Sequence, residues 1–325
     1  MKIAIVTDKP RVEFLPGEEG IQEDKQQKET MSYIKEALLD EYEVINLTMD
    51  QDLIKNIDEE NVDLVFNLCN GIQGESSLSQ LPSLLEYEDI PYTGSAPLGH
   101  GLAYNKIYSG KIFKSSNILT PGFTYVNSIE EIEDIELEFP LLVKPKDEGS
   151  SRGIQDDSLT YDKLSLINKI EECLELYNPP IMIMEYIDGR EFTVGVIGNG
   201  DDIRVLPILE IDFSKLPKEL NKIYSFEVKF KYGDDTVYHI PARIDEVTKK
   251  NIETTAINAF RSLGLRDYGR VDIRLQDGKP YVIEINSLPG LDKNNSDICK
   301  MAYSADMEYD ELIKEIVEMG LSRNN

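Results

Sequence analysis

The chain has 325 residues, and 34 basic against 61 acidic side chains give it a formal net charge of −27. Its length predicts about two or three domains, and its 41% of hydrophobic residues excludes general disorder. The acidity argues against nucleic-acid and anionic-membrane partners, which are bound by clustered Lys and Arg, but permits a small anionic ligand held by a few cations.

Cysteine and histidine are scarce. The cysteines Cys69, Cys173 and Cys299 form no CxxC pair, so neither a disulfide framework nor a cysteine-rich zinc site is indicated. Only His100 and His239 are present, which excludes a multi-histidine metal centre. The N-terminal apolar run is too short for a signal peptide, and no run approaches the ~18 apolar residues of a membrane span, so we expect a cytoplasmic protein.

The first part of the chain has the pattern of a parallel sheet. We predict strands over residues 2–7, 42–47 and 62–68 and a helix over 31–38, where apolar residues recur at helical spacing. Strands alternating with helices are typical of a parallel sheet with right-handed crossovers, which binds ligands at the carboxyl ends of its strands. The loops over 8–20 and 70–75 lie at those ends.

A stretch rich in Pro, Gly and Ser at residues 90–97 marks a domain boundary, and a third segment begins near Arg190. We therefore expect domains over residues 1–95, 96–190 and 191–325. The expected elements of the second are strands over 139–144 and 180–184 and an amphipathic helix over 164–174. Those of the third are a strand over 191–198, a long polar-aromatic loop to about residue 238, a helix over 252–263 and a final hairpin.

The final hairpin carries the sharpest signal in the chain. Residues 271–275 and 281–285 are alternating runs that flank Asp277-Gly278, a strong turn sequence. Because successive side chains of a strand point to opposite faces, one face of the hairpin is expected to be buried and the other polar. The expected buried face contains Val271, Ile273, Ile283 and Ile285, and the expected polar face contains Arg270, Asp272, Arg274, Glu284 and Asn286.

On the polar face we expect Asp272 nearly opposite Glu284, with Asn286 and Arg270 beside them. Carboxylate and amide oxygens are ligands that Mg²⁺ prefers, usually completed by substrate phosphates. An arginine there suits a reaction that develops negative charge on oxygen. The alternative is a solvated face with salt bridges from Asp272 to Arg270 and from Glu284 to Arg274.

Two lysines and a loop of small residues favour a phosphate site. The strand over 139–144 delivers Lys144 into the loop 145–153, whose glycines and serines let backbone N–H groups approach phosphate oxygens closely. Lys106 lies in a stretch compatible with a helix. The alternatives are a flexible turn for the loop and a solvated side chain for Lys106.

The polar turn over residues 184–191 follows a predicted strand. Such a linker can give adenine its backbone hydrogen bonds. Glu191 can accept hydrogen bonds from ribose hydroxyls. The alternative is an acidic turn between two strands.

Taken together, these segments resemble the ATP-grasp superfamily and, within it, the D-alanine–D-alanine ligases. The matching segments, in chain order, are residues 62–75, 90–106, 139–154, 184–198, 206–211, 237–242 and 268–290. The resemblance implies an α/β protein with the three-domain ATP-grasp fold. Its parts would be an N-terminal Rossmann-like parallel sheet for substrates, a central α+β domain and a C-terminal α+β domain with the metal and catalytic residues, with ATP between the last two. It also implies small amino-acid-like substrates, and homodimers are common in the family.

The resemblance also implies a two-step reaction. ATP phosphorylates a carboxylate to an acylphosphate, and an amine or hydroxyl then attacks while phosphate leaves. The implied catalytic residues are Arg270, which stabilises the tetrahedral intermediate, Ser150 of the closing loop, and Lys229. The implied ATP contacts are Lys106, Lys144, Ser151, Glu185, Ile187 and Glu191. The implied metal ligands are Asp272, Glu284 and Asn286, which would carry two Mg²⁺ ions, with Mn²⁺ as a substitute.

The positions expected to face the substrates depart from the family pattern. After its first strand the family has a Gly-Gly loop and a Ser-x-Glu motif, for which Glu13 is the substitute here. In a later motif, where the family has His-Gly before Gly-Glu, this chain has Asn70-Gly71, and Glu75 matches the family's glutamate. Phe230 stands where the usual D-alanine ligase has tyrosine, and in the family phenylalanine goes with ligases that use D-lactate. After Gly290 the family's serine-containing stretch is replaced by one in which Lys293, Asn294 and Asn295 can bind a carboxylate. Gly290 and Asn295 are the candidates for contact with the acceptor.

The leading interpretation is an ATP-dependent carboxylate–amine ligase with altered amino-acid pockets. A genuine D-alanine–D-alanine or D-alanine–D-lactate ligase is the second. A nucleotide-binding homologue without turnover is the third, and the presence of all three metal ligands argues against it.

Overall fold

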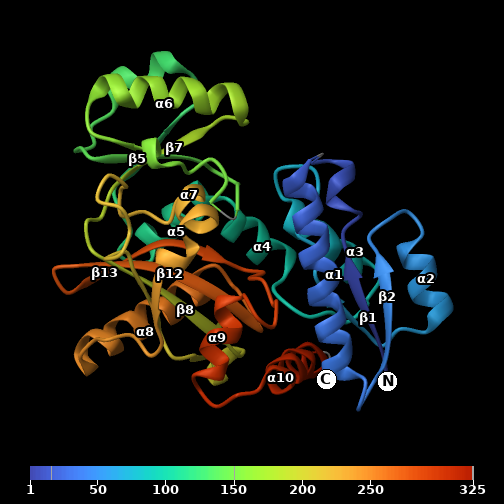
Figure 1. Ribbon diagram of the computed structural model, residues 1–325. Coiled ribbons are helices and arrows are strands. Elements are labelled where there is room, and N and C mark those ends of the chain that lie inside the picture. The colour runs from blue at the N-terminus through green and yellow to red at the C-terminus, as the bar shows by residue number, and fades with distance from the viewer. Residues whose placement is uncertain (16, 150, 324–325) are drawn as a thin grey trace.

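The computed structural model describes residues 1–15, 17–149 and 151–323 and shows a mixed α/β protein (Figure 1). The strands of these residues form three separate sheets. Short 3₁₀ turns occupy Arg11–Glu13, Ser77–Ser79, Ile129–Asp134, Asp156–Ser158, Gly200–Asp202 and Gly233–Asp235.

The N-terminal sheet is parallel, as predicted, with the strand order β2-β1-β3. Its strands are β1 (Lys2–Thr7), β2 (Glu43–Thr48) and β3 (Leu64–Asn67), and its helices are α1 (Glu18–Leu38), α2 (Leu53–Glu60) and α3 (Gln80–Tyr87). Helix α1 begins well before residue 31, the predicted start. The sequence did not reveal its first half because that half is polar and shows no apolar periodicity. No helix in the described ranges combines the length and apolar character needed to cross a membrane.

The central sheet is antiparallel and has the order β4-β7-β5-β6. Its strands are β4 (Phe123–Val126), β5 (Leu141–Pro145), β6 (Leu159–Thr160) and β7 (Ile181–Glu185). Helix α6 (Lys163–Leu176) covers one face and packs its apolar side chains against alternate residues of β5 and β7 (Figure 1). The opposite face carries Met182 and Met184, which pack with Ile107 and Ile283 and therefore face the C-terminal sheet.

The C-terminal sheet has the order β11-β10-β8-β12-β13, and β9 pairs with β8. Its strands are β8 (Arg190–Ile197), β9 (Arg204–Val205), β10 (Leu209–Asp212), β11 (Val237–His239), β12 (Tyr268–Gln276) and β13 (Lys279–Asn286), and its helices are α7 (Phe226–Lys231), α8 (Glu246–Ser262) and α9 (Asp297–Tyr303). The prediction of one long loop to about residue 238 is wrong, because β9, β10, α7 and most of β11 lie within it. These strands are too short to show the alternation that reveals a strand in sequence.

Three helices bridge the sheets. Helices α4 (Pro97–Tyr104) and α5 (Lys106–Ser115) lead toward the central sheet, yet Ala103 and Phe113 are buried in a core shared with the C-terminal sheet. Helix α10 (Tyr309–Ser322) returns to the N-terminal part and packs against α1 (Figure 1). We propose that the division at residues 95 and 190 holds, with these helices joining the three parts.

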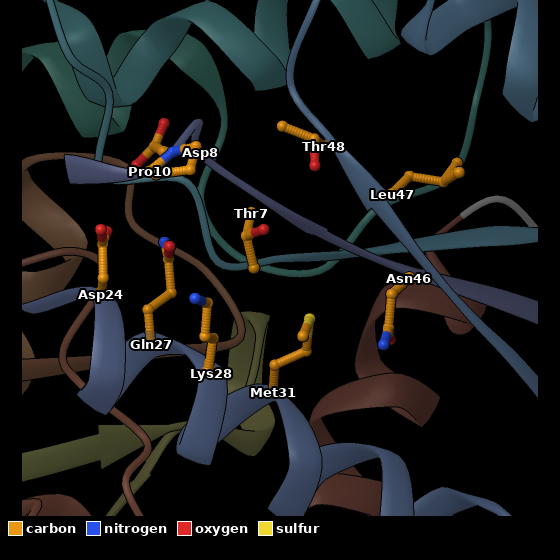
Figure 2. Close-up of a pocket in the computed structure, with 10 residues that line it drawn as sticks. All are labelled: Thr7, Asp8, Pro10, Asp24, Gln27, Lys28, Met31, Asn46, Leu47 and Thr48. Atoms are coloured by element: carbon orange, nitrogen blue, oxygen red, sulfur yellow. The ribbon is translucent and has the colours of Figure 1, made fainter. Parts of the chain in front are cut away.

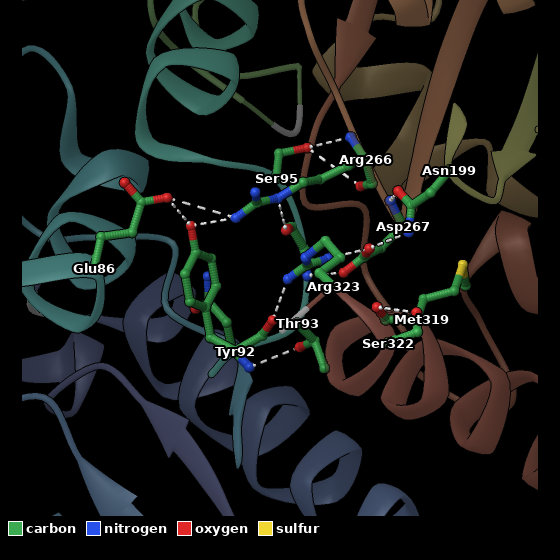
Figure 3. Close-up of polar contacts among 12 residues, drawn as sticks. Glu86, Tyr92, Thr93, Ser95, Asn199, Arg266, Asp267, Met319, Ser322 and Arg323 are labelled. Carbon is green, nitrogen blue, oxygen red and sulfur yellow. Dashed lines mark hydrogen bonds and ion pairs between the residues drawn. The ribbon is translucent and has the colours of Figure 1, made fainter. Parts of the chain in front are cut away.

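A buried ionic network fixes the segment after β3 to the loop before β12 (Figure 3). Asp267 is fully buried and accepts hydrogen bonds from the backbone N–H of Gly94 (2.6 Å) and from Asn199 Nδ2 (2.9 Å). Arg323, directly after α10, forms an ion pair with the same carboxylate, and Arg266 Nε donates to the Gly94 carbonyl at 3.2 Å. The network therefore holds together segments from the N-terminal and C-terminal parts.

Candidate active site

The register of the β12–β13 hairpin confirms the predicted alignment of its polar residues. Asp272 lies opposite Glu284, and Arg270 lies opposite Asn286. The turn falls at Asp277-Gly278, where both residues have positive φ, as the sequence predicts. The two carboxylates, the amide and the guanidinium therefore lie together on one face.

The prediction that Ile283 lies on the buried face of the hairpin is wrong. The register shifts after Asp272, so that Ile273 pairs with Val282 rather than with Ile283. Val282 is buried in the core, whereas Ile283 packs against Met182 and Met184 of the central sheet. An extra residue in one strand reverses the faces of the residues beside it, and a period-2 pattern gives no sign of this.

Two lysines converge on Glu284. Its Oε2 lies 3.7 Å from Lys144 Nζ and 3.9 Å from Lys106 Nζ, and Lys106 also donates to the carbonyl of Glu148 at 2.5 Å. Burial lowers the pKa of Lys144 to about 8, although Glu284 opposes the shift. Burial acts to raise the pKa of Glu284, but the lysines outweigh it and hold that pKa below its usual value. Two buried ammonium groups beside one carboxylate leave an excess of positive charge that an anion would neutralise.

Asp272 is the centre of a hydrogen-bonded set. Arg270 donates to it through Nε and Nη2, both at 3.1 Å, Thr193 Oγ donates at 2.5 Å, and Asn286 Nδ2 donates at 3.1 Å. No cluster of three or more His, Cys, Asp or Glu side chains suited to a metal occurs in the part of the chain described. A metal here would thus rely on the oxygens of Asp272, Glu284 and Asn286 plus oxygens of a substrate, which is the arrangement that suits Mg²⁺.

Arg274 organises the linker that was predicted to bind adenine and ribose. It donates to Glu191 Oε2 at 2.5 Å and to the carbonyl of Ile187 at 3.2 Å, and it also donates to the carbonyl of Lys222 at 2.5 Å. The alternative salt bridge from Arg274 to Glu284 is therefore wrong. Glu185 accepts a hydrogen bond from the Gly122 N–H at 3.0 Å, so its carboxylate holds the end of β7.

The Gly/Ser loop contacts the segment before α7. Ser151 Oγ donates to the carbonyl of Tyr224 at 2.8 Å, and the N–H of Phe226 donates to the carbonyl of Ile154 at 2.8 Å. Lys229 lies on α7, and burial, with Arg270 nearby, lowers its pKa. Two further predicted residues cannot be placed in this contact: Ser150 lies outside the described residues, and for Phe230 only the backbone, in α7, is described.

The sequence missed a charged contact between the N-terminal and central parts. Glu23 of α1 pairs with Arg11 Nε at 3.2 Å and with Arg152 Nη2 of the Gly/Ser loop at 2.6 Å. In contrast, Glu13 and Glu75, the candidates from sequence, are exposed. Glu23 and Arg152 are far apart in the chain, so no local pattern could have paired them.

A cavity of about 190 Å³ lies at the carboxyl ends of β1 and β2, beside α1 (Figure 2). Asp8 and Asp24 line it, but both carboxylates hold loops: Asp8 accepts from the N–H groups of Asn70 (2.8 Å) and Gly71 (3.1 Å), and Asp24 accepts from that of Val12 (3.2 Å). Burial raises the pKa of Asp8. The hollow is thus where an open parallel sheet predicts it, and its acids shape the loops around it.

The candidates for binding an acceptor carboxylate lie in the turn after β13. Asn295 directs its amide N–H to Asp292 Oδ1 at 3.0 Å, and the same oxygen accepts from the backbone N–H groups of Asn294 and Asn295. Gly290 is exposed at the start of this turn. The Asn295 side chain therefore stabilises the turn after β13.

Known proteins are similar to this chain in both sequence and fold. The family model described as D-ala D-ala ligase C-terminus matches residues 118–318. A protein of Sinorhizobium fredii named "Uncharacterized protein y4sG" is 35% identical over 80% of this chain and 75% of its own length. The D-alanine–D-alanine ligase of Desulforamulus reducens is 30% identical over 86% of this chain and 88% of its own.

Solved structures agree with these relatives. The D-alanine–D-alanine ligase from Bacillus anthracis complexed with ATP superposes with a TM-score of 0.78 at 25% identity, over 100% of this chain and 98% of that one. The VanG D-Ala:D-Ser ligase from Enterococcus faecalis has the same fold, with a TM-score of 0.75 at 21% identity, over 98% of this chain and 99% of that one. On these matches in sequence and structure, the chain belongs to the D-alanine–D-alanine ligase family and has the ATP-grasp fold.

Proposed function

We propose that this ATP-dependent, ADP-forming ligase activates one amino-acid-like substrate as an acylphosphate and joins it to a second, through pockets that differ from those of a D-alanine–D-alanine ligase. The observation that carries the proposal is the convergence of Lys106 and Lys144 on Glu284, beside the Arg270–Asp272 pair. Membership of the family supplies the reaction class.

In the first step the two lysines bind the phosphate oxygens of ATP. Their ammonium groups are already buried next to one carboxylate, so most of the cost of removing them from water is present before ATP binds. An incoming phosphate group then adds a favourable contact between opposite charges. Magnesium, held by Asp272, Glu284 and Asn286, would supply the remaining positive charge, and we propose two ions. Ile283, a partly buried member of the apolar cluster between the two sheets, would offer the adenine ring an apolar contact.

In the second step Arg270 stabilises the charge that develops when the acceptor attacks the acylphosphate. The loop 151–154 and the segment 224–226, which hydrogen-bond to each other, would exclude water while this intermediate exists. We propose that Lys229 and Ser150 contribute to this closed state.

Two sets of contacts support altered pockets. Glu23 pairs with Arg11 and Arg152 between the N-terminal and central parts, where we propose that the first substrate binds, and Asn295 donates its amide N–H to Asp292. Relatives named D-alanine–D-alanine ligase indicate amino-acid substrates, and the pockets argue for a different pair. The expected homodimer and cytoplasmic location stay predictions.

The test is ADP release in a coupled assay with Mg²⁺-ATP and a panel of D- and L-amino acids and D-lactate. We expect turnover with one pair, and a loss of about a hundredfold or more in Glu284→Gln, because the amide is a weaker metal ligand than the carboxylate and no longer pairs with Lys106 and Lys144. Glu315→Gln is the matched control, since Glu315 pairs with Arg204 far from the site. Equal ADP release by Glu284→Gln and the wild type would contradict the proposed site.

A further inference from the structure

Arg270 lies between two carboxylates from different elements. Asp272, on one side, belongs to the proposed metal site. Asp297, the first residue of α9, lies on the other side, with Oδ2 at 3.9 Å from Arg270 Nη1. Burial opposes a high pKa for Arg270, but Asp272 and Asp297 outweigh it and raise that pKa. Arg270 therefore links Asp297 to the proposed metal site, so a group bound at Asp297 would lie next to the residue proposed to act in the transfer step.

The groups around Asp297 form a cluster of mixed charge. Lys300 Nζ lies 3.2 Å from Asp297 Oδ1 and 4.7 Å from the ring centre of Tyr238, whose hydroxyl is 2.8 Å from that of Tyr224. Lys229 is also close enough for Asp297 to act on its pKa. The Asp297 side chain is 17% exposed, so it is accessible yet largely desolvated. One carboxylate among cations and phenols is complementary to a zwitterion, which carries an ammonium group and a carboxylate close together.

We propose that Asp297 holds the ammonium group of the acceptor and so makes the enzyme select α-amino acids over hydroxy acids as its second substrate. The proposal rests on the proposed ligase function. An acceptor ammonium group adds a charge-assisted hydrogen bond to a carboxylate that already pairs with Lys300 and Arg270, whereas the neutral hydroxyl of a hydroxy acid can offer only a weaker one. By resemblance Phe230 goes with D-lactate, so Asp297 and Phe230 make opposite predictions.

Before the transfer step the acceptor ammonium group gives one proton to Asp297, which passes it to solvent. The free amine then bonds to the carbonyl carbon of the acylphosphate, the bond from that carbon to the phosphate oxygen breaks, and phosphate leaves with the electron pair. The nitrogen loses a second proton, which ends on phosphate. Arg270 stays protonated throughout.

Hydroxylamine separates this inference from the proposed function, because it is a neutral nucleophile that traps an acylphosphate without an ammonium anchor. The acyl donor is first identified by ADP release with hydroxylamine, and acceptors are then compared with that donor. In Asp297→Asn we expect the KM of the amino-acid acceptor to rise about ten- to a hundredfold, while hydroxylamine-dependent ADP release changes by less than about threefold. Asp297→Glu should recover part of the loss, and the wild type should use D-alanine far better than D-lactate.

Two controls separate recognition from helix stability. Asp310→Asn removes an aspartate from the first turn of α10, away from the site, and should leave acceptor KM unchanged. Lys300→Met breaks the ion pair with Asp297 but keeps the carboxylate, so the preference for an amine should persist. An unchanged acceptor KM in Asp297→Asn, or equal use of D-lactate and D-alanine by the wild type, would overturn the inference. Failure of the wild type to release ADP with hydroxylamine and any donor would overturn the proposed function, and the inference with it.

Discussion

Acid should destabilise this protein through one buried histidine. His100 of α4 is fully buried, its Nδ1 lies 2.8 Å from Ser287 Oγ, and its Nε2 has no protein partner among the described residues. Burial, with Arg266 nearby, lowers the pKa of His100 from 6.5 to about 3. Below pH 6.5 the unfolded chain binds a proton that the folded chain does not. This contribution to stability is therefore complete above that pH and is lost as the pH falls toward 3.

The size of the loss follows from the two pKa values. A pH of about 5 lies about 1.5 units below the pKa of the histidine in the unfolded chain. Each pH unit below that pKa lowers the free energy of unfolding by about 1.4 kcal/mol, so the total loss should be about 2 kcal/mol. The matched variant is His100→Asn, which keeps a polar group near Ser287 but does not titrate. Its cavity lowers stability by an amount that does not depend on pH.

The assay is urea unfolding of both proteins between about pH 7.5 and pH 5, followed by circular dichroism. The many carboxylates titrate alike in both proteins, so their contributions cancel in the difference. We expect the wild type to lose its advantage over His100→Asn by about 2 kcal/mol across this range. A difference that stays constant with pH would refute the argument, because it would mean that folding does not lower the pKa of His100.

Three further predictions address the site and its supports. Lys144→Met should weaken Mg²⁺-ATP binding about tenfold or more, measured by calorimetry. Lys111→Met, on the outer side of α5 near Tyr125, should leave it unchanged, and equal affinities of the two variants for Mg²⁺-ATP would contradict the phosphate role of Lys144. Asp267→Asn should lower the free energy of unfolding by about 3 kcal/mol, since it leaves the guanidinium of Arg323 without its buried partner, and a loss below about 1 kcal/mol in urea would count against this. Glu23→Gln should raise the KM of the first substrate more than that of ATP, and an equal effect on both would argue against a place for Glu23 in that pocket.

Local patterns in the sequence determined the central part of the site. The Asp277-Gly278 turn fixed the hairpin, and strand alternation then placed Asp272, Glu284 and Asn286 on one face. The predicted strand over residues 139–144 likewise placed Lys144 at its end, before the Gly/Ser loop. These features depend on residues near one another in the chain, so spacing alone is informative.

The tertiary structure decided what these residues meet. Arg274 binds Glu191 rather than Glu284, Ile283 leaves the predicted core face, and Asp297 lies beside Arg270. The first depends on the pairing of β12 with β8, the second on a register shift, and the third on the path of the chain after β13. Contacts between distant segments arise from the packing of whole elements, and hydrophobic periodicity describes each element only by itself.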